Sequence, residues 1–362
     1  MSFAIVRLGA VVAVLATGLA VPCFAADPLG TAGPIRSAGE NTCNGDVAAA
    51  ARGECDPPSV DLAIPVERRS QARIERARLL VSLLRTEQAV QELDAAVTED
   101  PSNSAARLLR GRLKIFVKQD EATNDVEATL RIDPDHADAL ATRAFLLMGR
   151  DDKAGLQDAT RARILDPRNA DALWIRSLIL TRMGRLDEAE QELNSAATIE
   201  PGNPRTLMSR AEIRMLMGKS AEARDDATAV LAIRPDMGAL QVRAVVEAQS
   251  GDYAAAIDDF NAILGQPGDR RGGGVLGRDF VDLHIQRAVA LTRTGRLADA
   301  KRDLETIVTL GGTRAILQLQ LYLRSHGFPD VTLDGRRSDQ LDDALQACFI
   351  NDACGRGMTV RG

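Results

Sequence analysis

The spacing of apolar and polar positions along the chain predicts helices that come in pairs. In Ala170–Met183, apolar residues recur at the three- and four-residue spacing of a helical face. Gly184 then provides a turn, and Leu186–Ile199 repeats the helical pattern with small or apolar residues on one face. Pro201 ends this second segment because proline cannot continue a helix. The pattern therefore predicts a helix–turn–helix hairpin.

The same hairpin recurs with a nearly fixed period. The prolines that close successive repeats are Pro101, Pro134, Pro167, Pro201 and Pro235. Their spacing of about 34 residues is typical of helical solenoids. Seven repeats can be counted, at 70–101, 104–134, 137–167, 170–201, 204–235, 237–266 and 280–310. We therefore expect an all-α solenoid over residues 67–312.

Three small residues recur at fixed places in these repeats. They are a small residue in the first helix (Ser177, Ala211, Ala244, Ala288), a turn glycine (Gly184, Gly218, Gly251, Gly295) and an alanine in the second helix (Ala189, Ala223, Ala256, Ala300). With the closing proline, these residues resemble the tetratricopeptide repeat family. The resemblance implies a right-handed superhelical solenoid of about seven repeats, whose concave face is suited to an extended peptide or a partner helix.

A charged pair also recurs in every repeat. An arginine stands directly before the small residue of the first helix, and a carboxylate follows at a nearly constant spacing in the second helix. The pairs are Arg76 and Glu92, Arg110 and Asp125, Arg143 and Asp158, Arg176 and Glu192, Arg210 and Asp226, Arg243 and Asp259, and Arg287 and Asp303. We predict structural ion pairs within each repeat, partly buried and bidentate. An anion-binding groove lined by these arginines is the functional alternative.

The amino terminus has the pattern of a secretory signal. Arg7 precedes the apolar run Leu8–Val21, and Cys23–Ala25 fits a small-x-small cleavage site. The run is short for a membrane span, which needs about 20 residues. We expect residues 1–25 to be a cleaved signal peptide of a bacterial protein that is periplasmic or secreted, without a stable membrane span. An uncleaved anchor is the alternative.

Four cysteines remain after this cleavage. Cys43 and Cys55 fall in residues 26–66, which are rich in Gly, Pro, Ala, Asn and Asp and predict a flexible linker. Cys348 and Cys354 lie near the carboxyl end. An even number of cysteines in an exported chain indicates disulfides, and the short separations favour Cys43–Cys55 and Cys348–Cys354. Free thiols are the alternative.

The period stops after Leu310, and residues 313–362 form a different segment. They contain Leu317-Gln318, Leu321, Gly327-Phe328, Asp334-Gly335 and Ala344-Leu345. These residues resemble the small helical peptidoglycan-binding module of bacterial cell-wall proteins, and the resemblance implies a glycan ligand. The alternative is a helical cap that covers the last repeat, which solenoids need.

Composition narrows the classes of function. Aromatic residues make up only 3% of the 362 residues, which disfavours a β-sandwich or barrel. The net charge of −6 argues against nucleic-acid binding by bulk electrostatics. The three histidines are far apart in sequence, and they form no pattern of metal ligands or of a catalytic triad. We therefore expect no enzyme activity, no metal and no cofactor.

The leading interpretation is an exported, non-enzymatic scaffold whose groove binds a protein or peptide partner in the bacterial cell envelope. The groove residues expected to point away from the packed face are Trp174, Arg182, Phe145, Met148, Met208 and Met215. An exposed tryptophan near methionine and arginine is typical of binding surfaces, although a core position is the alternative. The second interpretation is an envelope protein tethered to peptidoglycan, whose repeats recruit a wall enzyme or assembly factor.

Overall fold

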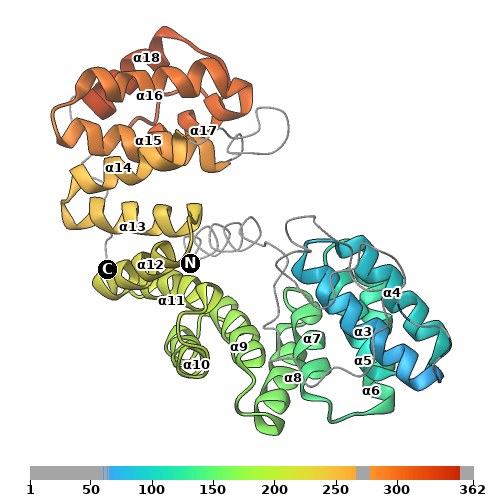
Figure 1. Ribbon diagram of the computed structural model, residues 1–362. Coiled ribbons are helices and arrows are strands. Elements are labelled where there is room, and N and C mark those ends of the chain that lie inside the picture. Colours follow the sequence, from blue (N-terminus) through green and yellow to red (C-terminus); the bar gives the residue numbers. More distant parts are fainter. Residues whose placement is uncertain (1–59, 61–62, 64, 266–277, 351–362) are drawn as a thin grey trace, which may run out of the picture. The chain divides into compact units, whose positions relative to one another are not determined.

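The computed structural model describes residues 60, 63, 65–265 and 278–350. These residues contain sixteen α-helices and a short π-helix, and no strand occurs among them (Figure 1). The chain divides into two compact bodies, which we call the first body (to Pro201) and the second body (from Gly202). Each is described by itself.

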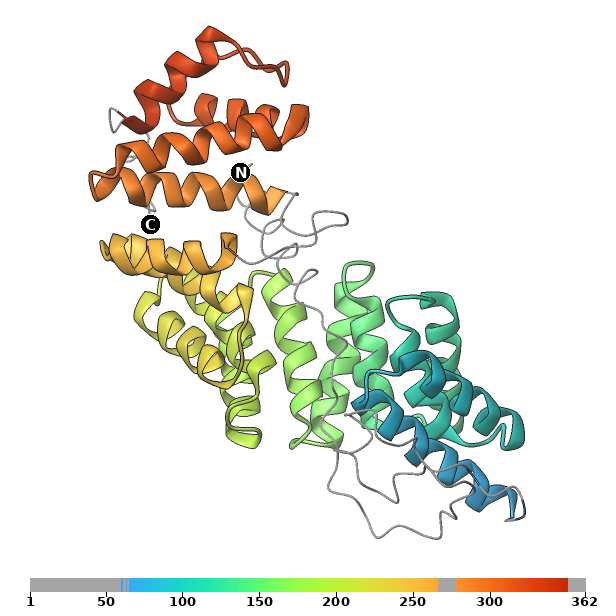
Figure 2. The same ribbon diagram turned by 45° about the horizontal axis from the view of Figure 1, so that its top comes forward.

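The first body contains four antiparallel helix pairs, and the two helices of each pair lie side by side (Figure 2). The pairs are α3 (Val66–Ser82) with α4 (Thr86–Glu99), α5 (Ser104–Lys114) with α6 (Gln119–Ile132), α7 (Ala137–Leu147) with α8 (Asp152–Leu165), and α9 (Ala170–Arg182) with α10 (Leu186–Ile199). Each pair corresponds to one of the first four repeats.

The second body continues with three further pairs and then a different segment. The pairs are α11 (Pro204–Leu216) with α12 (Ser220–Ile233), α13 (Met237–Ser250) with α14 (Tyr253–Leu264), and α15 (Arg278–Arg293) with α16 (Leu297–Leu310). After them come α17 (Gly312–Ser325), α18 (Asp339–Leu345) and the π-helix η1 (Gln346–Ile350). The predicted all-α fold of stacked helix-pair repeats is confirmed.

Local sequence explains where these helices begin and end. The side chains of Asn103, Asn169 and Asn203 each accept a hydrogen bond from a backbone N–H in the first turn of the helix that follows. This contact satisfies one of the donors that the start of a helix leaves unpaired. Gly184 follows α9 at a φ of 75°, which a glycine adopts without steric cost. An asparagine therefore starts several first helices, and a glycine turns the chain after them.

Small residues set the distance between the helices of a repeat. The small first-helix residues that follow the repeat arginines are fully buried at Ala77, Ala144, Ser177, Ala211, Ala244 and Ala288. In the second repeat this residue is Gly111, where a Cβ atom would lie 3.2 Å from the backbone oxygen of Ala122. Helices α5 and α6 therefore approach more closely there than an alanine would comfortably allow.

The C-terminal segment shares one hydrophobic core with the last repeat. Leu319 and Leu323 of α17 and Leu341 of α18 belong to the same buried cluster as Leu304 and Ile307 of α16. The apolar side chains of the segment are thus turned toward the repeat. This packing favours the interpretation of a cap over that of a separate module.

The leucines of α17 differ in how deeply they are buried. Leu321, which belongs to the residues that resemble the peptidoglycan-binding module, is half exposed, whereas Leu319 and Leu323 are buried. Gln320, also buried, accepts hydrogen bonds from the backbone N–H groups of Asp334 and Gly335 and donates to Asp334. The repeated Leu-Gln-Leu-Gln-Leu sequence offers both registers, and only the position of the last repeat selects one.

Several expectations lie outside the described residues. They are the signal peptide over residues 1–25, the cysteines Cys43 and Cys55, and Cys354. Cys348 is described and is fully buried in the core of the C-terminal segment. Both disulfide pairings therefore stay predictions. Among the described helices, none is long and apolar enough to cross a membrane.

Candidate functional site

The structure brings the repeat arginine and its acid together in all seven repeats. In four of them the Nε and an Nη atom of the arginine both donate to the aspartate at 2.5–2.9 Å, namely at Arg110, Arg143, Arg210 and Arg243. Arg287 bonds both oxygens of Asp303 in the same way. These five pairs have the bidentate geometry that suits a guanidinium and a carboxylate.

The two glutamates differ from the aspartates. Glu92 and Glu192 each accept a single hydrogen bond from the arginine of their repeat, from Nη1 of Arg76 and of Arg176 respectively. The expectation of a bidentate pair was therefore wrong for these two repeats. Glutamate has one methylene group more than aspartate. Its carboxylate therefore meets the guanidinium at Nη1 and not at the edge formed by Nε and Nη2.

Burial and hydrogen bonding act in opposite directions on these groups. Burial raises the pKa of Asp303, but hydrogen bonds from Arg287 and His284 outweigh it, so the net pKa is lowered. His284 Nδ1 lies 2.8 Å from the same carboxylate. The hydrogen bond with Asp259 likewise raises the pKa of Arg243. The hydrogen bonds thus favour the charged forms of Asp303 and Arg243. Most of the acids of the seven pairs lie in the interior.

Some repeat arginines also reach the preceding repeat. Arg110 donates to Asp94 on α4 at 2.8 Å, and Arg176 donates to Thr160 on α8 at 3.2 Å. Each of these acceptors stands at the same distance in sequence before its arginine. A single guanidinium therefore links the first helix of its repeat to two second helices, a role that the sequence analysis did not anticipate.

The same link persists across an insertion. Arg287 donates to Asn261 on α14 at 2.8 Å, although these two residues are further apart in sequence than the other linked pairs. The additional residues lie between α14 and α15, which are separated by a longer connection than the other repeats. The insertion thus leaves this contact between neighbouring repeats in place.

Three aromatic side chains form a continuous contact across the first body, and we call them the aromatic row. Phe116, which follows α5, meets Phe145 of α7 edge-on with ring centroids 5.9 Å apart. Phe145 in turn stacks on Trp174 of α9 at 6.2 Å. The exposed fraction is 48% at Phe116 and only 6% at Trp174. The row therefore begins at the surface and ends in the core.

Trp174 is thus not the exposed side chain that the sequence analysis expected. It lies on the buried side of α9, where Phe145 covers one face of its indole. The exposed member of the row is Phe116, which the sequence analysis missed. Phe116, Phe145 and Trp174 are equally spaced in the sequence, at a separation shorter than the repeat. This spacing is the signal that could have identified the row.

The other expected groove residues do not form one surface. Met148 is half-buried, and Arg182 is engaged with Asp152 of α8 at 3.2 Å. Met208 and Met215 lie in the second body, where both pack against the buried cluster around Leu207. Of the six, Phe145 and Trp174 contact each other in the first body, whereas Met208 and Met215 pack on one cluster in the second body.

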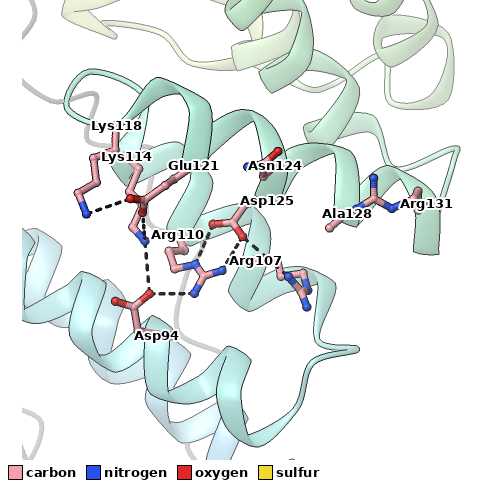
Figure 3. A pocket seen from close by; sticks show the side chains of 10 residues that line it. All are labelled: Asp94, Arg107, Arg110, Lys114, Lys118, Glu121, Asn124, Asp125, Ala128 and Arg131. Atoms are coloured by element: carbon pink, nitrogen blue, oxygen red, sulfur yellow. Dashed lines mark hydrogen bonds and ion pairs between the residues drawn. The ribbon is translucent and has the colours of Figure 1, made fainter.

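A polar hollow of about 510 Å³ is lined by side chains from α4, α5 and α6 and by Lys118 (Figure 3). Its charged lining consists of Arg107, Arg110, Lys114, Lys118, Arg131, Asp94, Glu121 and Asp125. Most of these side chains interact with one another across the hollow (Figure 3). Within the part of the chain that the structure describes, no group of His, Cys, Asp and Glu side chains is arranged to hold a metal ion.

The comparisons with known proteins agree with this architecture. The sequence model of a tetratricopeptide repeat family matches residues 74–113, 153–204 and 210–271. The tetratricopeptide repeats expected from the sequence are thus confirmed. The matched residues end before the C-terminal segment, for which no support for peptidoglycan binding was found. No curated protein matches the chain.

Solved structures with a similar fold include the APC/C hetero-tetramer Cut9–Hcn1. Its TM-score is 0.53 at 13% identity, over 78% of this chain and 58% of that one. Two others are PilW, described as a widely conserved type IV pilus biogenesis factor, and PilF of Pseudomonas aeruginosa. Both have a TM-score of 0.48; PilW is 20% identical over 54% of this chain and 93% of its own, and PilF 16% over 56% and 95%.

The fold and the repeats define the class of protein. The chain contains tetratricopeptide repeats, and domains built from such repeats bind protein or peptide partners. Proteins of this class are generally non-catalytic.

Proposed function

We propose that this protein is an exported, non-enzymatic scaffold whose repeats bind a protein or peptide partner in the bacterial cell envelope. The observation that carries the proposal is the aromatic row of the first body. It presents Phe116, with the neighbouring Val117 79% exposed, next to two aromatic rings that are already packed. Aromatic side chains dominate the binding energy of many protein interfaces.

The contacts within the row favour binding for a physical reason. Phe145 is held between Phe116 and Trp174, so its side chain has little rotamer freedom to lose when a partner arrives. Ordering of a flexible side chain costs about 0.5–1.5 kcal/mol on binding, and a ring that is already packed avoids much of this cost. Three successive repeats thus contribute to one preorganised apolar edge.

Capture from a periplasmic extract tests this part of the proposal. The wild-type chain is expected to retain a specific protein, and Phe116→Asp is expected to weaken that retention at least about tenfold, because a central aromatic contact is worth about 2 kcal/mol or more. Ile164→Asp is the matched control, since Ile164 is also apolar and exposed in the same body but lies outside the row. Equal loss of the partner from both variants would contradict a role for the row.

The export part of the proposal rests on the amino-terminal sequence. We expect the mature protein to begin at Ala26 and to be released with the periplasmic fraction, because the apolar run is too short to span a bilayer of about 30 Å. Intact-mass measurement of the protein from fractionated cells checks both points. A full-length mass in the membrane fraction would establish the uncleaved anchor instead.

We infer that the C-terminal segment caps the last repeat rather than tethering the protein to peptidoglycan. Leu319, Leu323 and Leu341 bury their side chains in one core with α15 and α16, which leaves the end of the solenoid covered. Retention of the full chain on purified peptidoglycan sacculi would contradict this inference.

A further inference from the structure

The geometry points to a binding site for an acidic peptide segment in the polar hollow lined by side chains from α4, α5 and α6. This inference rests on the proposed function, because the acidic segment would belong to the partner that the scaffold binds. The hollow belongs to the first body and is bordered by second helices of consecutive repeats (Figure 3). It is therefore formed by residues other than those of the aromatic row.

The charges of the lining are unbalanced. Five cationic side chains face three carboxylates, Asp94, Glu121 and Asp125, so the lining carries an excess of two positive charges. The whole chain, in contrast, has a net charge of −6. A hollow with low-dielectric walls and one dominant sign of charge concentrates ions of the opposite sign. The hollow thus favours an anionic ligand, although the protein as a whole is negatively charged.

Lys114 shows that the floor of the hollow departs from the commonest form of the repeat. Four positions after the repeat arginine, four other repeats have a leucine, at Leu80, Leu147, Leu180 and Leu291, and the remaining two have Arg214 and Glu247. Lys114 occupies this position in the second repeat with an exposed fraction of only 7%. Its ammonium lies 3.0 Å from Glu121 and 3.3 Å from Asp94. A lysine is rarely so buried, and helix packing alone is served by leucine.

The cationic side chains at the floor of the hollow, Arg110 and Lys114, are more buried than those at the rim, Lys118 and Arg131. Arg110, at the floor, donates to both Asp125 and Asp94, so its guanidinium is already satisfied. At the rim, Lys118 is 60% exposed and contacts Glu121. Arg131 is exposed, and no dashed line joins its guanidinium to the other side chains drawn in Figure 3. The cationic groups at the rim are therefore accessible to a ligand. Those at the floor are held in place by their hydrogen bonds and ion pairs.

Carboxylates of a peptide fit this arrangement better than a nucleic-acid backbone does. A guanidinium such as that of Arg131 binds a carboxylate in a bidentate manner. The three carboxylates of the lining would repel a continuous row of phosphates, whereas the separated side chains of an acidic peptide can avoid them. Salt is expected to weaken the interaction, because exposed charges are screened over about 10 Å at 0.1 M ionic strength.

Fluorescence anisotropy with the full mature chain tests the inference. The probe is a short labelled peptide of alternating Glu and Ser, and the matched peptide has Gln in place of Glu. We expect the Glu peptide alone to bind, and we expect Arg131→Glu and Lys118→Glu each to weaken it about three- to tenfold. Arg168→Glu, a substitution of the same charge at an exposed residue of the first body outside the hollow, is expected to leave binding unchanged.

The outcomes separate this inference from the proposed function. Absence of binding by the Glu peptide, or equal weakening by Arg168→Glu and Arg131→Glu, would overturn the site. So would tighter binding of a single-stranded oligonucleotide than of the Glu peptide. If the aromatic row still captures a partner in those cases, the proposed function stands and only the acidic site falls. Far-UV circular dichroism of each variant checks that the fold is intact.

Discussion

Replacement of Arg243 by leucine is expected to lower the free energy of unfolding by about 3 kcal/mol. The guanidinium of Arg243 bonds both oxygens of Asp259 at 2.7 Å, and Asp259 is buried. Loss of the arginine leaves a buried carboxylate without its partner, which typically costs about 3–5 kcal/mol. Because Arg243 itself is partly exposed, the lower end of this range applies. Thermal and urea denaturation of the full chain measure the effect.

A double-mutant cycle distinguishes an ion pair from two independent contacts. Asp259→Leu alone should also destabilise the fold, whereas the two substitutions together should cost clearly less than the sum of the single effects. Arg296→Leu is the control, because Arg296 is 51% exposed in its pair with Asp299, and its loss should leave the stability unchanged. Single variants at residues 243 and 259 that unfold like the wild type would show that the pair has no structural role.

Replacement of Glu212 by glutamine is expected to stabilise the protein above pH 8. Burial, with a smaller contribution from Asp236, raises the pKa of Glu212 from 4.5 to about 8. In the unfolded chain this carboxyl ionises near its ordinary pKa, whereas the folded chain keeps it protonated. The stability therefore falls as the pH rises from 4.5 to about 8 and then stays constant. Glutamine does not ionise in either state, so the variant does not lose this stability as the pH rises.

The size of the gain follows from the difference in pKa. A shift of this size corresponds to at most about 5 kcal/mol, and we expect roughly 2–4 kcal/mol because the folded state can relax around the charge. Denaturation series at pH 4 and pH 9 measure it: the variant and the wild type should be similar at pH 4 and differ at pH 9. Glu222→Gln, at an exposed position of α12, is the control. An equal gain at both pH values would contradict the expected pKa.

Much of the fold follows from the sequence because the same residue types recur at the same positions in every repeat. A proline that ends one helix is ambiguous, but prolines that recur at a period of about 34 residues fix the hairpin as the building block. The arginine and its acid could be predicted for a similar reason. Any one pair has many potential partners, whereas seven pairs at the same two positions leave facing helices as the common explanation.

The sequence did not predict the features in which the position of one side chain depends on residues of a neighbouring repeat. Trp174 is buried, and one of the residues that pack on it is Phe145, which belongs to another repeat. The bond that Arg110 donates to Asp94 likewise depends on how consecutive repeats stack. In α17, the alternation of leucine and glutamine fits two registers, and contact with α16 selects Leu319 over Leu317. The period of about 34 residues describes each repeat by itself, so it does not predict contacts between repeats.

The most direct test of the central claim is photo-crosslinking in living cells. A photoreactive phenylalanine analogue at position 116 would place the reactive group at the exposed end of the aromatic row, and the same analogue at position 164 is the control. We expect a discrete crosslinked adduct with a second envelope protein from position 116 and none from position 164. Adducts from position 164 alone, or from neither position, would contradict the claim that the aromatic row binds the partner.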